Sequence, residues 1–178
     1  MIEEIKSMIL DLCKDPGWRD HIESVVKFSE ILARKLNADI EICLISAWLH
    51  DIKKIKGEKD KHHVHGSEEA GEILMKLYYP ADRIEKVKHC ILTHSSDMNY
   101  IPKSIEAKVI TSADALSHFS NFLDLAQTAF TFRKLSLEEG RNWLIKKYQG
   151  YWNKVQILPE ARDLVKDQYD AIKLILGI

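Results

Sequence analysis

A histidine and an aspartate stand side by side, as His50 and Asp51, at the end of the apolar segment IEICLISAWLHD. A helix that is apolar on nearly all sides is typical of a protein core. An ionised carboxylate at the end of such a helix is costly unless a positive charge compensates it. A metal ion fits this role, because imidazole nitrogen and carboxylate oxygen both bind manganese, iron, nickel, cobalt and zinc. The alternative is a solvated pair at a surface helix end.

Two residues far away in the sequence have the same chemistry. His21 shares a helical face with Val25, Phe28 and Leu32, which predicts that its imidazole points inward. Asp114 lies in the segment VITSADALSHF, at the edge of an apolar helix face, where an aspartate competes for backbone hydrogen bonds and loses hydration. Taken alone, each has an ordinary structural explanation: a core histidine with a hydrogen-bond partner, or an aspartate bonded to a neighbouring helix end.

Taken together, His21, the doublet of His50 and Asp51, and Asp114 within SADAL resemble the HD-domain phosphohydrolase superfamily, over residues 18–130. The resemblance is greatest to small, stand-alone bacterial and archaeal members. It implies an HD-like helical bundle in which these four side chains ligate a divalent metal ion. Magnesium then joins the candidate ions, with one or two ions per chain. Asp51 would be the ligand that bridges two metals.

The resemblance also bears on the remaining histidines. Binuclear members of the family hold a second metal with histidines between the doublet and the last aspartate, and His65 and His94 match that arrangement approximately. For both, substrate contact or support of the first ligands is the alternative. We expect His62 and His63, in a charged loop, to be solvated, and His118 to have a structural role.

The predicted function is that of a metal-dependent phosphohydrolase in which metal-activated water attacks a nucleotide or a related small phosphorylated molecule. Asp51 and Lys54 are the predicted catalytic residues. Arg19, Lys54 and His65 are the predicted substrate-binding residues, since a guanidinium fork and an ammonium both bind phosphate. Many family members read HDIGK where this chain reads HDIKK, so Lys53 indicates a different loop conformation.

Two other functions stay open at this point. Some proteins that resemble this superfamily are oxygenases with a mixed-valent di-iron site, which would require the additional histidines. A non-catalytic regulatory or binding module, stabilised by a metal, is the other alternative.

The elements that must position these residues are helices, because no window alternates apolar and polar residues long enough to predict a sheet. We predict an all-α, single-domain bundle of about eight or nine helices over residues 1–178. Its motif-bearing core spans about 18–130, with C-terminal helices at 137–176 packed on it. The predicted helices are 2–14, 20–36, 40–51, 67–78, 84–94, 105–116, 121–133, 137–148 and 159–176.

The composition of the chain limits the kinds of partner that we expect. The chain has 178 residues with 26 basic and 27 acidic side chains, so no strong field attracts nucleic acid or an anionic membrane. The N-terminus lacks the uninterrupted apolar stretch of a secretory signal, and no run is long enough to span a membrane. Its three cysteines lie far apart without zinc-type spacing. We therefore expect a cytoplasmic protein with a small phosphorylated substrate; a homodimer stays open.

Overall fold

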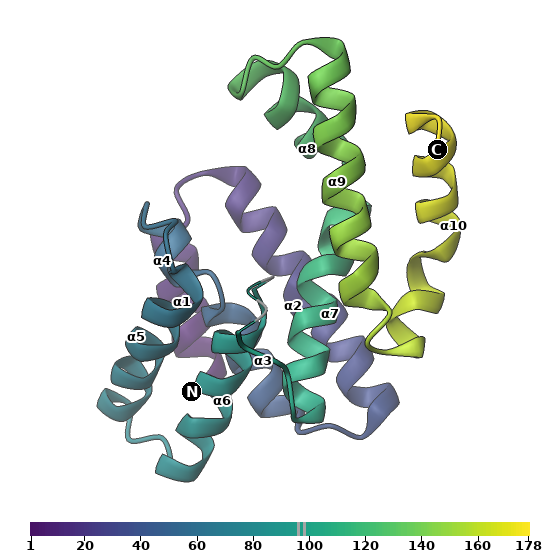
Figure 1. Cartoon of the computed structure of the whole chain (residues 1–178). Coiled ribbons are helices and arrows are strands. Elements are labelled where there is room, and N and C mark those ends of the chain that lie inside the picture. Colours follow the sequence, from purple (N-terminus) through teal and green to yellow (C-terminus); the bar gives the residue numbers. More distant parts are fainter. Residues whose placement is uncertain (96, 98) are drawn as a thin grey trace.

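A computed structural model describes residues 1–95, 97 and 99–178 of the chain, and its regular elements are helices throughout this range (Figure 1). The predicted all-α bundle is confirmed. The elements are α1 (Ile2–Leu12), α2 (Pro16–Leu36), α3 (Ile40–Leu49), α4 (Ile52–Ile55), α5 (His62–Lys76), α6 (Ala81–Thr93), α7 (Ile105–Ser120), α8 (Phe122–Gln127), the π-helical segment η1 (Thr128–Phe132), α9 (Leu137–Val155) and α10 (Pro159–Leu176).

The short helix α3 lies at the centre of the bundle. It packs against α1, α2, α6 and α7, which explains why nearly its whole surface is apolar. Its start is fixed by the Asp39 side chain, which accepts a hydrogen bond from the backbone N–H of Ile42 over 3.1 Å. The helix ends at Leu49, so His50 and Asp51 follow directly from the most buried element of the fold.

The long helix α2 begins earlier than predicted. Asp15, Pro16 and Gly17 read as a turn in the sequence, but Asp15 is the N-cap of α2 and its side chain accepts a hydrogen bond from the Gly17 N–H. Pro16 then occupies the first helical position, where its missing N–H costs nothing. His21 is consequently placed in the second turn of α2 rather than at its start.

The segment after the doublet differs most from the prediction. The sequence predicts a charged loop over residues 53–66, whereas the structure has a single-turn helix α4 and then α5, which begins at His62 instead of Ser67. Lys61 turns the chain into α5 with a left-handed backbone (φ 42°). Lys53, which replaces the common glycine, pairs with Glu69 of α5 across 3.0 Å. The histidines of this segment are therefore held on a helix.

Two helices on the other side of the bundle are longer than predicted. Helix α7 continues to Ser120, so His118 lies one turn beyond Asp114 on the same helix. Helix α9 continues to Val155, seven residues beyond the predicted end at Tyr148. Both α9 and α10 pack on α7, and Figure 1 shows them on the face of α7 away from α5 and α6. Within the described part of the chain, no helix is both long and apolar enough to cross a membrane.

We expect the substitution Ile45→Ala in α3 to lower the free energy of unfolding by roughly 2–5 kcal/mol, because it leaves a cavity in the core around a fully buried side chain. Urea unfolding followed by circular dichroism measures this loss. Ile175→Ala in α10, at a side chain that is 68% exposed, is the matched control and should change stability by less than about 0.5 kcal/mol. Similar losses for the two variants would contradict the central position of α3.

Candidate metal centre

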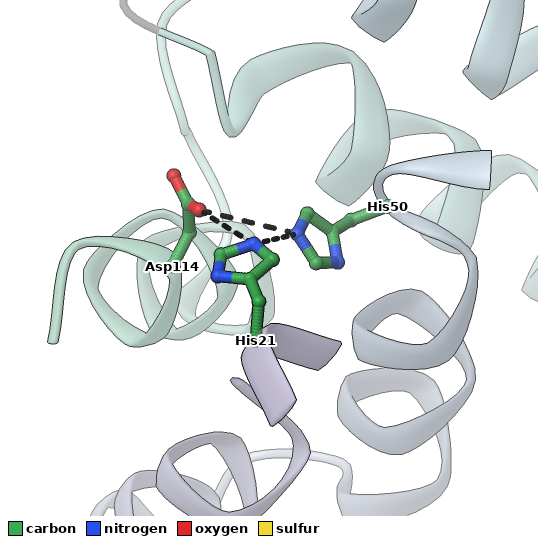
Figure 2. A group of neighbouring side chains, drawn as sticks. All are labelled: His21, His50 and Asp114. Carbon is green, nitrogen blue, oxygen red and sulfur yellow. Dashed lines mark hydrogen bonds and ion pairs between the residues drawn. The ribbon is translucent and has the colours of Figure 1, made fainter. Parts of the chain in front are cut away.

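The four predicted ligands meet at one point of the bundle, although they come from three different helical regions. The Nε2 atom of His21 in α2 lies 3.4 Å from Nε2 of His50, 3.6 Å from Oδ2 of Asp51 and 3.6 Å from Oδ1 of Asp114 in α7. His50 Nε2 is in turn 3.5 Å from Asp51 Oδ2. Figure 2 shows His21, His50 and Asp114 pointing toward one another. We refer to these four residues as the metal centre.

Hydrogen bonds fix which nitrogen each histidine presents to the centre. The Nδ1 atom of His50 lies 2.8 Å from the carbonyl oxygen of Ala47, so Nδ1 is the protonated nitrogen that donates. The Nδ1 atom of His21 lies 3.0 Å from the hydroxyl oxygen of Ser117, which itself donates to the carbonyl of Asp114. In its neutral form, each ring therefore turns the Nε2 lone pair toward the two carboxylates.

A bound cation accounts for this arrangement of donor atoms better than hydrogen bonds among the four side chains do. Two imidazole lone pairs and two carboxylate oxygens face one another, and none of the four atoms carries a proton to share. One donor atom from each of His21, His50 and Asp114 lies within 4.8 Å of the others, which suits ligands around one ion. Nitrogen and oxygen donors without a thiolate match the ions predicted from the sequence.

The second oxygen of Asp51 faces a different pair of histidines. Its Oδ1 atom lies 3.3 Å from Nε2 of His94 at the end of α6 and 3.6 Å from Nε2 of His62 at the start of α5. All three atoms are buried and have no hydrogen-bond partner within the described part of the chain. His94 also donates from Nδ1 to the carbonyl of Ile91. Asp51 thus divides its oxygens between two groups of nitrogen donors, as a bridging carboxylate would.

His65 does not belong to this second group, and the prediction placed the wrong histidine there. On helix α5 the buried face is centred on His63, Gly66 and Ala70, and His62 lies at the edge of this face. At about 100° per residue, His65 falls nearly opposite and is exposed. It lines a surface pocket with Glu68, Glu69 and Glu72 instead.

Two lysines match the charge of the two carboxylates. Lys54 of α4 donates to Oδ2 of Asp51 over 3.0 Å. Lys154 of α9 donates to Oδ2 of Asp114 over 2.9 Å and to the carbonyl oxygen of His94 over 2.8 Å. The lysines therefore supply part of the compensation that the sequence assigned to a metal alone. The unprotonated nitrogens and the bare Oδ1 of Asp51 still lack a positive partner.

The pKa values follow from burial and from these charges. Burial lowers the pKa of His50 to about 4, with Asp51 opposing the shift, and burial also lowers the pKa of His118 to about 3. For Asp51, burial alone would raise the pKa, but Lys54, His50 and hydrogen bonds outweigh it and hold the pKa well below its usual range. Near neutral pH His50 is therefore neutral and Asp51 is ionised, which are the metal-binding forms of these two side chains.

Further residues lie around the rim of the centre. His118 was expected to have a structural role; its Nε2 lies 3.8 Å from Asp114 Oδ1, and its ring stacks on that of Tyr151 from α9 at 4.2 Å. Arg19, predicted to bind phosphate, is exposed, and its guanidinium lies 3.9 Å from Glu23. No contact of Arg19 with the centre occurs among the described residues, so its role stays a prediction. Lys54 lies against Asp51, and its catalytic and phosphate-binding roles also stay predictions.

Comparison with protein families identifies the family of this chain. The family model described as "HD domain" matches residues 18–118, more than half of the chain. The chain belongs to the HD-domain family. The match contains all four residues of the metal centre together with Lys54, His62 and His94, and it ends before α9. HD domains bind divalent metals, and the two groups of histidine and aspartate side chains in this HD domain could hold such ions.

The fold agrees with a solved structure, a predicted HD superfamily hydrolase from an uncultured Thermotogales bacterium. That structure superposes with a TM-score of 0.61, covers 86% of this chain and 88% of its own, and is 21% identical. Among curated proteins, this HD domain is similar to a tRNA (cytidine(56)-2'-O)-methyltransferase from Thermoplasma volcanium, at 28% identity over 79% of this chain. It is also similar to a ribonuclease Y from Cutibacterium acnes, at 33% identity over 55% of this chain.

The aligned regions make up 44% of the methyltransferase and 17% of the ribonuclease, so this chain spans less than half the length of these relatives.

The sequence alone did not place His62, His118 and Lys154 beside the metal centre. For His118 a signal was available, because it lies four residues after Asp114 and must share its helical face. His62 was obscured by the charged residues before it, which read as loop. Lys154 had no local signal, since nothing in the sequence of α9 indicates which helix it packs against.

Lys154 provides a first test of the centre. We expect Lys154→Gln to weaken Mn²⁺ binding by roughly 10-fold to 100-fold, because the ligand Asp114 loses the cation that fixes its second oxygen. Isothermal titration calorimetry of the metal-free protein with MnCl₂ measures the dissociation constant. Lys146→Gln, an exposed position on the same helix, is the matched control. Equal affinities in the two variants would show that Lys154 does not support the centre.

A second test uses the neutral histidines. Burial, and after it the positive charge of Lys54, lowers the pKa of His62 to about 3. Below about pH 6.5, His62 therefore binds a proton in the unfolded chain but not in the folded chain. The stability due to neutral His62 is complete above pH 6.5 and is lost as the pH falls toward 3. Between pH 6 and 5, His62→Gln should reduce the slope of unfolding free energy against pH by about 1.4 kcal/mol per pH unit. Urea titrations of metal-free protein measure the slope; an unchanged slope would refute the buried, neutral state.

Proposed function

We propose that this HD domain is a divalent-metal-dependent phosphohydrolase that cleaves a phosphoester or phosphoanhydride of a nucleotide or a related small phosphorylated molecule. The observation that carries the proposal is the convergence of His21, His50, Asp51 and Asp114, with unprotonated donor atoms, beside the ammonium group of Lys54. A divalent cation bound there supplies Lewis-acid chemistry: it lowers the pKa of a water ligand and neutralises charge on phosphoryl oxygens.

The side chains around the centre have separate tasks in this proposal. His21, His50 and Asp114 hold the cation, and Asp51 serves both groups of donors. Lys54 is 27% exposed while its Nζ stays on Asp51, so it can contact a phosphoryl oxygen at the open side of the centre. The buried packing beneath His50, in α3, keeps bulk water out from behind. The partly exposed side chains of Lys54 and His118 mark a side from which the substrate could approach.

The activity test is a reconstitution followed by a substrate panel. Metal-free protein is loaded in turn with Mn²⁺, Fe²⁺, Co²⁺, Ni²⁺, Zn²⁺ or Mg²⁺, and phosphate release is measured from nucleoside mono-, di- and triphosphates and cyclic nucleotides. Because relatives include ribonuclease Y, a short RNA is also in the panel, with product size as its readout. We expect at least one substrate to be cleaved.

Asp51→Asn should lose more than about 100-fold of that activity, which exceeds the loss typical of residues that only support metal ligands. The variant keeps the size of the side chain but removes the charge shared by both donor groups. Glu72→Gln, which makes the same loss of charge at an exposed position on α5, is the control and should remain active. Turnover that is equal in wild type and Asp51→Asn, or missing with every metal and substrate, would contradict the proposal.

The arrangement around Asp51 also favours one alternative. Because His62 and His94 both face Oδ1 of Asp51, the chain has enough histidines for a second metal, as a di-iron oxygenase would need. Metal analysis distinguishes the two functions. About two iron ions per chain, with no phosphate release from any substrate, would favour the oxygenase. A metal that raises thermal stability without any turnover would favour a non-catalytic module.

A further inference from the structure

Helix α9 lies entirely outside the HD-domain match, and one of its faces extends away from the metal centre. Lys154, Tyr151, Lys147 and Trp143 are spaced by three or four residues and therefore lie along one stripe of the helix. At the end of the stripe, Lys154 binds Asp114 and Tyr151 stacks on His118. Lys147 follows one turn further on, about 6 Å along the helix axis from Tyr151.

Two cations near the far end of this stripe, Lys147 on α9 and Arg133 after η1, have no acidic partner in the described part of the chain. Lys147 and Arg133 form no ion pair with any residue of the described chain, unlike Lys54 and Lys154. Instead, both lie against the same indole: the Lys147 Nζ is 5.4 Å and the Arg133 Cζ is 5.5 Å from the centre of the Trp143 ring. Two like charges gathered around one ring repel each other, and cation–π attraction offsets this only in part. An anion between them would relieve the repulsion.

The electrostatic environment of Lys147 agrees with a position near the metal centre. Its pKa is lowered by burial first and then by the positive charges of Lys54, Lys154 and Arg133, while Asp114 opposes the shift. Lys54 and Lys154 bind the two carboxylates of the metal centre, and Lys147 lies on the same stripe of α9 as Lys154. The side of the centre near Lys54 and His118 is open, since these side chains are 27% and 25% exposed.

We propose that Lys147 and Arg133 form a subsite for a second phosphate group of the substrate, whose first phosphate lies at the metal centre. The substrate class is then a compound with at least two linked phosphates, such as a nucleoside diphosphate, rather than a monophosphate. Side chains on a helix lean toward its N-terminus, so Lys147 reaches away from Lys154 and toward the distal end of such a substrate. This inference rests on the proposed phosphohydrolase function and narrows its substrate.

Calorimetric titration of the full, chelator-treated chain tests the subsite without turnover. The probes are methylenediphosphonate, which has two linked phosphoryl groups and resists hydrolysis, and methylphosphonate, which has one. We expect wild type to bind the diphosphonate at least about tenfold more tightly, as an additional charge-assisted contact implies. Lys147→Gln and Arg133→Gln should each remove most of this preference. Lys146→Gln makes the same charge change on the neighbouring exposed residue and should keep it.

The inference is overturned if wild type shows no preference for the diphosphonate, if Lys147→Gln and Arg133→Gln keep the preference, or if Lys146→Gln loses it equally. The last result would mean a diffuse effect of charge. Thermal melting of each variant verifies that the fold is intact. Failure of the proposed function has a different signature: the preference and its dependence on Lys147 would persist while no substrate of the panel is cleaved.

Discussion

The structure depends on keeping two ionised carboxylates, Asp51 and Asp114, inside a helical bundle. Each costs several kcal/mol to bury without compensation. One lysine pairs with each carboxylate. The imidazoles of His21, His50 and His94 also surround them, and the Nδ1 atom of each ring makes a hydrogen bond directed away from the carboxylates. Because every outward bond uses a proton, the inward atoms are left as acceptors. A set of inward acceptors around two carboxylates is stable only with cations close by.

This constraint explains why α9 belongs to the centre although the HD-domain match ends before it. Lys154 reaches Asp114 from α9, and the hydroxyl group of Tyr148 donates to the carbonyl of His118 over 3.0 Å. Helix α7 is thereby fixed from behind by the same helix that neutralises its aspartate. Tyr148 is almost fully buried, so the docking of α9 is part of the core. Packing of the C-terminal helices and charge compensation at the centre are therefore coupled.

How far the sequence could predict the centre depends on whether the signal was local. His50 and Asp51 were marked by the apolar helix before them, and Asp114 by its unfavourable position in mid-helix. The start of α5, with His62, was missed because the charged residues before it read as loop, although the Lys and Glu side chains of this region pair with each other. That error exchanged His62 for His65. Lys154 depends on long-range packing, for which a single sequence has no pattern.

The charges of the centre also explain why a bound metal would strengthen the attraction for a phosphate. With neutral histidines, Asp51 and Asp114 balance Lys54 and Lys154, so these groups together carry no net charge. A divalent cation would leave an excess of two positive charges in a buried place, where the effective dielectric constant is low. An anionic ligand at the open side relieves that excess. In the proposed function, metal and phosphoryl group would therefore stabilise each other's binding, and cations beyond the centre, such as Lys147, would extend the attraction to further anionic groups of the same ligand.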